Sequence, residues 1–269
     1  MPEQAMDYLE IEKLESGVVH VAMNRGAVNA VDREMYIEIA DFFSKIDATE
    51  FLAGAIILSG SGRHFCGGND LNEFATMTPD NASERMWRVR EAFFSVMECR
   101  VPVIGAVRGA ALGTGLALAA SCDFVLAGND AQFGLPELTV GVMGGARHLA
   151  RLAPQPLVRR MYFTGEALSA ADFAAGGGAI KVCDNDDVLP EAKRLAGRIA
   201  QYSPTAVRVS KHVLDRIERM DIKEGYRFEQ AATERMSGHP DSTEALAAFR
   251  DRRDPSYLPF DNASHWFGL

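Results

Sequence analysis

Two glycine-rich segments, residues 61–71 and 105–115, have the composition of turns that offer backbone N–H groups to a ligand. Each follows an apolar stretch that is typical of a buried strand. Glycine lets a ligand approach the backbone and a helix start carries free N–H groups, so each turn can supply one donor. Two donors on one oxygen would stabilise a carbonyl that becomes negative during reaction. Close packing of a helix on a strand is the alternative reason for the small residues.

Glu137 has the type and setting of an acid–base group. It follows Pro136 at the end of a predicted strand and precedes an apolar run, residues 140–143. A carboxylate in apolar surroundings has a raised proton affinity, which suits a general acid or base. A surface or helix-capping glutamate is the alternative that the local sequence allows.

Five segments in this order resemble motifs of the enoyl-CoA hydratase/isomerase (crotonase) superfamily. Residues 65–71 (FCGGNDL) and 102–123, which end in Ser-Cys-Asp, resemble its two oxyanion-hole segments. Residues 131–141 (AQFGLPELTVG) resemble the segment of its catalytic glutamate. Residues 24–30 resemble its N-terminal substrate loop, and residues 164–170 the junction before its C-terminal helices. The matches span most of the chain.

The resemblance implies an acyl-coenzyme A enzyme that uses no metal or redox cofactor, because coenzyme A is part of the substrate. It assigns proton transfer to Glu137 and the two oxyanion N–H donors to Asn69 and Thr114. Arg63 and the Arg252–Arg253 pair, together with Arg25, are candidates for the coenzyme A phosphates. Residues expected to bind substrate are Arg25, Ala27, Gly67, Gly68, Asp70, Leu71, Gly113, Ala117 and His148.

Ala117 is the main departure from the family pattern. Hydratases of the family have a second glutamate here, which helps to activate water, whereas one glutamate facing an apolar residue is the isomerase pattern. We therefore expect a single base, Glu137, to move a proton while the N–H groups stabilise a thioester enolate. Asn69, Asn72 or His148 could replace the missing group in a hydratase-like enzyme, although a structural role is the alternative for His148.

Two other functions stay open. One is a hydrolase or ring-cleaving enzyme of the same fold that acts on a cyclic acyl-CoA. The other is a non-catalytic acyl-CoA-binding homologue. A dinucleotide site is disfavoured, because Gly113-x-Gly115 lacks the third glycine and the later acidic residue of that fingerprint. A serine hydrolase is disfavoured because there is no Gly-x-Ser-x-Gly motif.

Length and charge restrict the class of protein further. A chain of 269 residues can bury a full core, and a net charge of −9 opposes binding to nucleic-acid phosphates. No apolar run reaches the ~18 residues of a membrane span, and the N-terminus does not resemble a signal peptide. The four cysteines form no Cys-x-x-Cys pair and the histidines lack metal-ligand spacing. We expect reduced thiols, no metal, no membrane and a cytoplasmic location.

Strands and helices that would position the site follow from hydrophobic periodicity. Strand–turn–helix units repeat up to about residue 152, which predicts an α/β fold with right-handed crossovers. The predicted strands are 8–14, 17–23, 54–59, 101–107, 124–127, 131–133 and 179–182. The predicted helices are 33–46, 81–98, 114–120, 157–163, 170–175, 189–202, 205–219, 222–237 and 243–250.

The chain is mostly helical after residue 152, and the apolar stripes of its late helices exceed what a short segment can bury. Such stripes predict contacts with another subunit. The resemblance implies a stacked ββα spiral with a C-terminal helical trimerisation region, assembled as a homotrimer or as a hexamer of two trimers. We expect residues 1–200 to form the spiral core with the acyl-CoA site and residues 201–269 the oligomerisation region.

Overall fold

The computed structural model describes residues 6–48 and 53–260 of the chain. Its main sheet has six strands in the order β1-β2-β3-β4-β6-β9, of which β1 and β2 are antiparallel and all later neighbours are parallel. The strands are β1 (Leu9–Lys13), β2 (Val18–Met23), β3 (Ala55–Gly60), β4 (Val103–Val107), β6 (Phe124–Gly128) and β9 (Ile180–Cys183).

A second sheet of three short strands lies in the order β5-β7-β8. These strands are β5 (Ala110–Leu112), β7 (Gln132–Gly134) and β8 (Leu168–Ser169). The chain passes from β4 to β5 and then into α4 (Thr114–Ser121), and from β6 to β7 and then toward α5 (Ala146–Leu152). These two units thus each place one strand in each sheet before a helix, as in the predicted ββα spiral.

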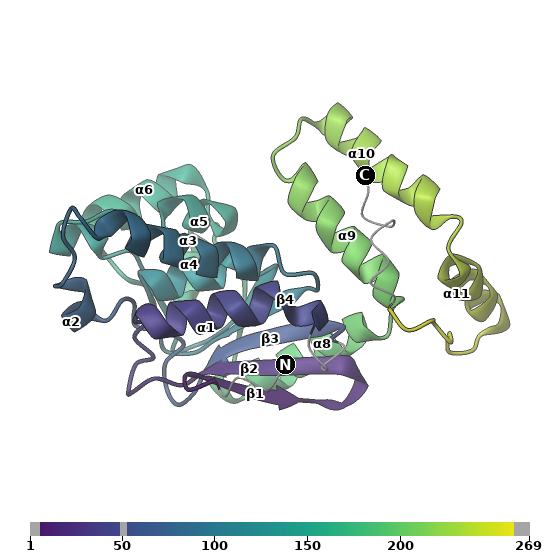
Figure 1. Ribbon diagram of the computed structural model, residues 1–269, viewed down its shortest axis with the longest axis horizontal. Helices are drawn as coiled ribbons and strands as arrows, with labels where there is room; N and C mark the ends of the chain where they lie inside the picture. The colour runs from purple at the N-terminus through teal and green to yellow at the C-terminus, as the bar shows by residue number, and fades with distance from the viewer. Residues whose placement is uncertain (1–5, 49–52, 261–269) are drawn as a thin grey trace.

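Helices cover both faces of the main sheet (Figure 1). On one face, α1 (Arg33–Ser44), α3 (Ala82–Met97) and α4 enclose the largest apolar core. On the other face, α8 (Val188–Ala200) packs on β3 and β4. The N-cap of α1 is Asp32, whose side chain accepts a hydrogen bond of 2.9 Å from Met35 N, as the sequence predicts.

Shorter helices connect these layers. They are α2 (Leu71–Phe74) and the 3₁₀ helix Glu137–Val140 at the site, and α6 (Gln155–Thr164) and α7 (Ala170–Ala175) beyond it. In the described part of the chain, no helix is both long enough and apolar enough to cross a membrane. All four cysteines are free thiols.

The last three helices extend away from the sheet (Figure 1). They are α9 (Pro204–Ile217), α10 (Ile222–Met236) and α11 (Pro240–Asp251), and a small cluster of Val209, Val213 and Ala232 joins α9 to α10. Ion pairs fix α9 to the body: Arg208 Nη2 lies 2.8 Å from Asp47 Oδ1, and Lys211 Nζ lies 2.8 Å from Asp123 Oδ1.

The sequence predictions agree with most of these elements. Helix α11 begins three residues earlier than predicted, at Pro240, where proline is tolerated because the first helical N–H needs no partner. Strands β5 and β8 and helices α2 and α5 were not predicted. All four are short, so they carry too few residues to show a period.

Candidate active site

The two glycine-rich turns lie side by side because a short parallel bridge joins them. Cys66 N donates a 2.9 Å hydrogen bond to Ala110 O, and Leu112 N donates one of 3.1 Å to Cys66 O. A side chain at Gly115 would place its Cβ only 2.1 Å from Cys66 O, so no other residue fits there without moving the backbone. Close approach of the two segments therefore explains part of the glycine content.

Asn69 and Thr114 follow these turns, and each has an amide free for a ligand. Val31 N donates a hydrogen bond to Gly68 O, and Val31 O accepts one from Asp70 N. Asn69 lies between Gly68 and Asp70 in the chain, so its N–H points away from Val31. Thr114 is the first residue of α4, where an N–H has no intrahelical acceptor. Within the described residues, neither amide donates a hydrogen bond. The turns thus present two free donors on adjacent segments.

The carboxyl group of Glu137 lies against the second turn. A Cβ on Gly113 would be 3.1 Å from Glu137 Oε1, and one on Gly145 would be 3.8 Å from it. The other oxygen, Oε2, is buried, and no described residue gives it a hydrogen bond. Burial raises the pKa of Glu137 above its usual value. A buried carboxyl oxygen without a protein partner is suited to accept a proton from a ligand.

The segment that follows Glu137 carries exposed apolar side chains. Leu138, Val140 and Met143 are exposed, Met143 by 82%, so an apolar rim follows Glu137 along the chain. In the loop that follows, Gly144 N donates a 3.3 Å hydrogen bond to Tyr162 Oη, which connects this loop to α6. The rim matches the apolar run on which the sequence prediction for Glu137 rested.

Tyr36 is a residue of the site that sequence reasoning missed. It extends from α1 to both turns: its hydroxyl donates a 2.6 Å hydrogen bond to Asn69 Oδ1 and lies 2.7 Å from Thr114 Oγ1. The side chain is 2% exposed. A signal was present, because Tyr36 shares the buried face of α1 with Ile39 and Phe43 at helical spacing, and a phenol on such a face needs a partner.

The chain as a whole is similar to known proteins. The family model described as enoyl-CoA hydratase/isomerase matches residues 13–259. The chain belongs to the enoyl-CoA hydratase/isomerase family.

Individual members of the family are similar over most of their length. The chain is 35% identical over 225 residues to (7aS)-7a-methyl-1,5-dioxo-2,3,5,6,7,7a-hexahydro-1H-indene-carboxyl-CoA hydrolase of Mycobacterium tuberculosis, covering 81% of this chain and 89% of the relative. It is 33% identical to a probable enoyl-CoA hydratase of Mycobacterium leprae, covering 88% and 93%. The crystal structure of enoyl-CoA hydratase from Bacillus anthracis superimposes with a TM-score of 0.88 at 28% identity, covering 94% and 100%. The fold is therefore the crotonase fold.

Arg25, from the loop that resembles the family's substrate loop, has three partners within the protein. Its guanidinium bonds to Ala30 O at 2.8 Å and lies 2.7 Å from Asp32 Oδ2 and 2.9 Å from Asp70 Oδ2. Asp70 in turn caps α2, and the Arg25 guanidinium lowers the pKa of its carboxyl group. Arg25 thus links the loop to the start of two helices.

Other predicted binding residues line the first turn or lie farther out. Gly67 N donates to Val28 O at 2.7 Å, so the first turn and the loop that carries Ala27 are in contact. Gly68 has a φ of +114°, a conformation that favours glycine, and Leu71 is exposed at the start of α2. Arg63 is exposed in the turn after β3, whereas Arg253 is paired with Glu244 at the end of α11.

His148 and Ala117 occupy apolar surroundings. The His148 ring packs edge-on against Phe93, with ring centres 5.0 Å apart. Burial, assisted by nearby arginines, lowers the pKa of His148 to about 4, so the ring is neutral at pH 7. Ala117 is 1% exposed and belongs to the main core. No cluster of potential metal ligands occurs among the residues that the structure describes.

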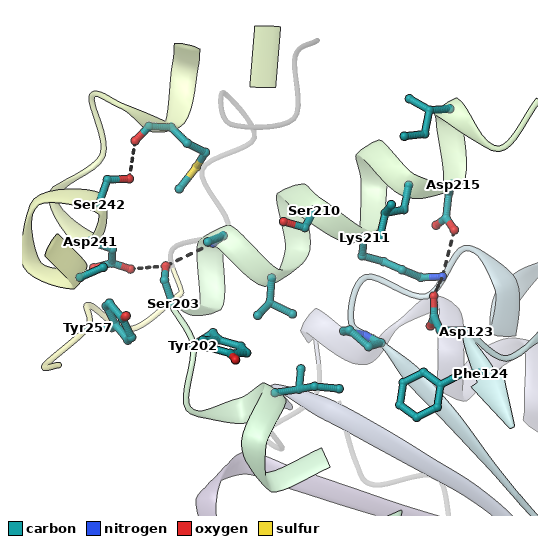
Figure 2. Close-up of a pocket in the computed structure, with 18 of the residues that line it drawn as sticks. Asp123, Phe124, Tyr202, Ser203, Ser210, Lys211, Asp215, Asp241, Ser242 and Tyr257 are labelled. Carbon is teal, nitrogen blue, oxygen red and sulfur yellow. Dashed lines mark hydrogen bonds and ion pairs between the residues drawn. The ribbon is translucent and has the colours of Figure 1, made fainter. Parts of the chain in front are cut away.

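A large cavity lies elsewhere, between the sheet and the C-terminal helices. It has a volume of about 840 Å³. Figure 2 shows Lys211 between Asp123 and Asp215 at one end, and the hydrogen-bonded pair Ser203 and Asp241 at the other. None of the residues predicted for the active site lines this cavity. The cavity therefore lies beside α9, apart from the residues predicted for the active site.

Proposed function

We propose that this family member stabilises the enolate of an acyl-CoA thioester and moves a proton with one carboxylate, Glu137. The observation that carries the proposal is the buried Oε2 of Glu137, which has no hydrogen-bond partner among the described residues. Its carboxyl group lies against the turn that bears the N–H of Thr114. Proton acceptor and oxyanion donors thus come from adjacent segments. This combination is what removal of a proton next to a carbonyl requires.

In this mechanism the thioester oxygen accepts hydrogen bonds from the N–H groups of Asn69 and Thr114. Glu137 removes a proton from the α- or γ-carbon of the acyl group, and the electron pair moves to the thioester oxygen as the enolate forms. Glu137 then returns the proton to the other carbon, which shifts the double bond. No water is consumed, so the reaction needs only one acid–base group.

Isomerisation is favoured over hydration by the residue at position 117. Its methyl group cannot activate water, and the neutral ring of His148 lies against Phe93 rather than in a hydrogen bond with a described residue. A second carboxylate is therefore absent from the position where hydratases of the family carry one. Isomerisation by Glu137 alone is the chemistry that we expect first.

A ring-opening hydrolase is the second candidate, because the relative from Mycobacterium tuberculosis is named as a hydrolase of a cyclic acyl-CoA. In that reaction Glu137 would take a proton from water, whose oxygen attacks a ring ketone. The carbon–carbon bond toward the thioester breaks, and the resulting enolate is held by the same two N–H groups until it is protonated. The ketone carbon becomes a carboxylate.

A panel of acyl-CoA thioesters distinguishes these reactions. Isomerisation leaves the mass unchanged, whereas hydration and ring opening both add one water, and only ring opening creates a new carboxylate. Exchange of substrate protons with D2O, followed by NMR, detects enolate formation even without net turnover. Binding without exchange or turnover for any member of the panel would identify a non-catalytic homologue instead.

Glu137→Gln is the decisive variant. We expect kcat or the exchange rate to fall by roughly 10²–10⁴, with little change in acyl-CoA affinity, because the amide keeps the shape but accepts no proton. Glu12→Gln, at an exposed position of β1, is the matched control and should keep its activity. Unchanged exchange in Glu137→Gln would mean that another group is the base.

We also propose that the protein assembles through its C-terminal helices. Ile222 and Phe249 are 87% and 83% exposed, and Leu214, Tyr226 and Leu246 add further apolar surface on α9, α10 and α11. Apolar surface of this extent marks an interaction site. A homotrimer, or a hexamer of two trimers, is the assembly that the family relationship favours.

A further inference from the structure

Tyr36 connects two segments that are far apart in the chain. It lies 33 residues before Asn69 and 78 residues before Thr114, and its hydroxyl is within hydrogen-bond distance of both side chains. These residues are the ones whose backbone N–H groups we propose as oxyanion donors. A single buried hydroxyl therefore links the side chains of both donor residues.

The order of donors in this network follows from its chemistry. Asn69 Oδ1 only accepts, and Tyr36 has one proton, which it donates to that oxygen. The Tyr36 oxygen is then left to accept the proton of the Thr114 hydroxyl. Burial raises the pKa of Tyr36, so the phenol stays protonated and the order persists at neutral pH. Each member of the network is thus satisfied.

The Tyr36 ring is itself fixed. It packs edge-on against Phe93 of α3, with ring centres 6.3 Å apart, and α1 is anchored by the cap at Asp32. A rigid support of this kind limits movement of the attached turns, because buried hydrogen bonds are costly to leave unmade.

We propose that Tyr36 is a positioning residue that sets the distance and direction between the two oxyanion N–H groups through the side chains of Asn69 and Thr114. The inference rests on the proposed function, since it requires those N–H groups to bind the thioester oxygen. Oxyanion donors act over a narrow range of about 2.7–3.1 Å, and displacements near 1 Å can cost about 100-fold in rate. Loss of the link should therefore reduce kcat more than affinity.

Tyr36→Phe tests this directly, because it removes the hydroxyl and keeps the ring that packs on Phe93. We expect kcat to fall by about 10- to 100-fold, with KM changed by less than about threefold. Thr114→Val should have a similar effect, whereas Thr114→Ser keeps the hydroxyl and should retain activity. The double variant Tyr36→Phe/Thr114→Val should lose little more than Tyr36→Phe alone, because Tyr36→Phe already breaks the link to Thr114.

Phe42→Leu controls for a purely structural effect. It perturbs the buried face of the same helix, α1, at a position six residues beyond Tyr36. We expect it to lower the melting temperature and leave kcat nearly unchanged. If Phe42→Leu and Tyr36→Phe lower kcat equally at equal loss of stability, Tyr36 has no positioning role.

Infrared spectroscopy separates failure of this inference from failure of the proposed function. The probe is butyryl-CoA labelled with 13C at the thioester carbon, whose carbonyl stretch falls in frequency as the oxygen accepts hydrogen bonds. A large shift in the wild type and a smaller one in Tyr36→Phe supports the inference. Equal shifts in both proteins overturn it but leave the oxyanion site intact, and no shift in the wild type overturns the proposed function itself.

Discussion

In the proposed mechanism, the requirements of catalysis and of stability oppose each other at Glu137. Burial raises its pKa, so the ionised form that accepts a proton is the form that the fold disfavours. Because the folded state binds the Glu137 proton more tightly than the unfolded state, its ionisation reduces stability as pH rises through the folded pKa. His148 has the opposite dependence, since its lowered pKa favours the neutral ring and its contribution is lost as pH falls toward 4.

The consequence for Glu137→Gln is a gain in stability where activity is lost. We expect a higher melting temperature than wild type at pH 7–8, and a difference that fades as pH falls toward the ordinary glutamate value near 4.5. Thermal unfolding across this pH range measures it. A lower melting temperature for Glu137→Gln at pH 8 would contradict the assigned environment of this carboxyl group.

At the scale of elements, one guanidinium organises the starts of two helices. Asp32 caps α1, Asp70 caps α2, and both carboxylates pair with Arg25. We expect Arg25→Met to cost on the order of 1–3 kcal/mol, because it leaves partly buried partners unsatisfied. Arg33→Met, at an exposed arginine beside the same cap, should change stability by less than about 0.5 kcal/mol. Chemical denaturation of both variants checks the difference, and equal losses would refute a special role for Arg25.

The same arginine tests the predicted phosphate contact. If Arg25 also binds the 3′-phosphate of coenzyme A, the wild type should bind butyryl-CoA more tightly than 3′-dephospho-butyryl-CoA, and Arg25→Met should remove that preference. An unchanged preference would mean that another group binds the 3′-phosphate, and the exposed Arg63 would be the next residue to test.

The sequence predicts elements well where a hydrophobic period is long enough. Strand β3 and helix α1 are examples, because an apolar run with glycine at its end and a capped amphipathic segment each have a strong local signal. Strand β5 has three residues between glycines, so it has no period, although it brings the second turn to the first. Glu137 comes close to Gly113, and Tyr36 to Thr114, only when the layers of the fold pack together. No local sequence pattern predicts these contacts.

At the scale of the whole molecule, the body and the C-terminal helices differ in how they bury apolar surface. The body encloses apolar cores between its main sheet and the helices on each face of that sheet, whereas the α9–α10 pair has only a small cluster of its own. The 840 Å³ cavity lies where these parts meet (Figure 2). A second subunit packed on this region would bury apolar surface that is exposed to solvent in a single chain.

Assembly should therefore fail when charge is placed on the exposed face of α10. Light scattering should give a wild-type mass three or six times that of the 29.3 kDa chain at micromolar concentration. Ile222→Glu/Tyr226→Glu should shift the protein to smaller species, because buried like charges oppose association. The helix itself should tolerate the change, since acidic residues suit its first turns and both side chains are exposed. Lys45→Glu, at the residue that follows α1, changes net charge by the same amount and should leave the mass unaltered. A monomeric wild type, or an unaltered mass for the α10 variant, would exclude this face as the interface.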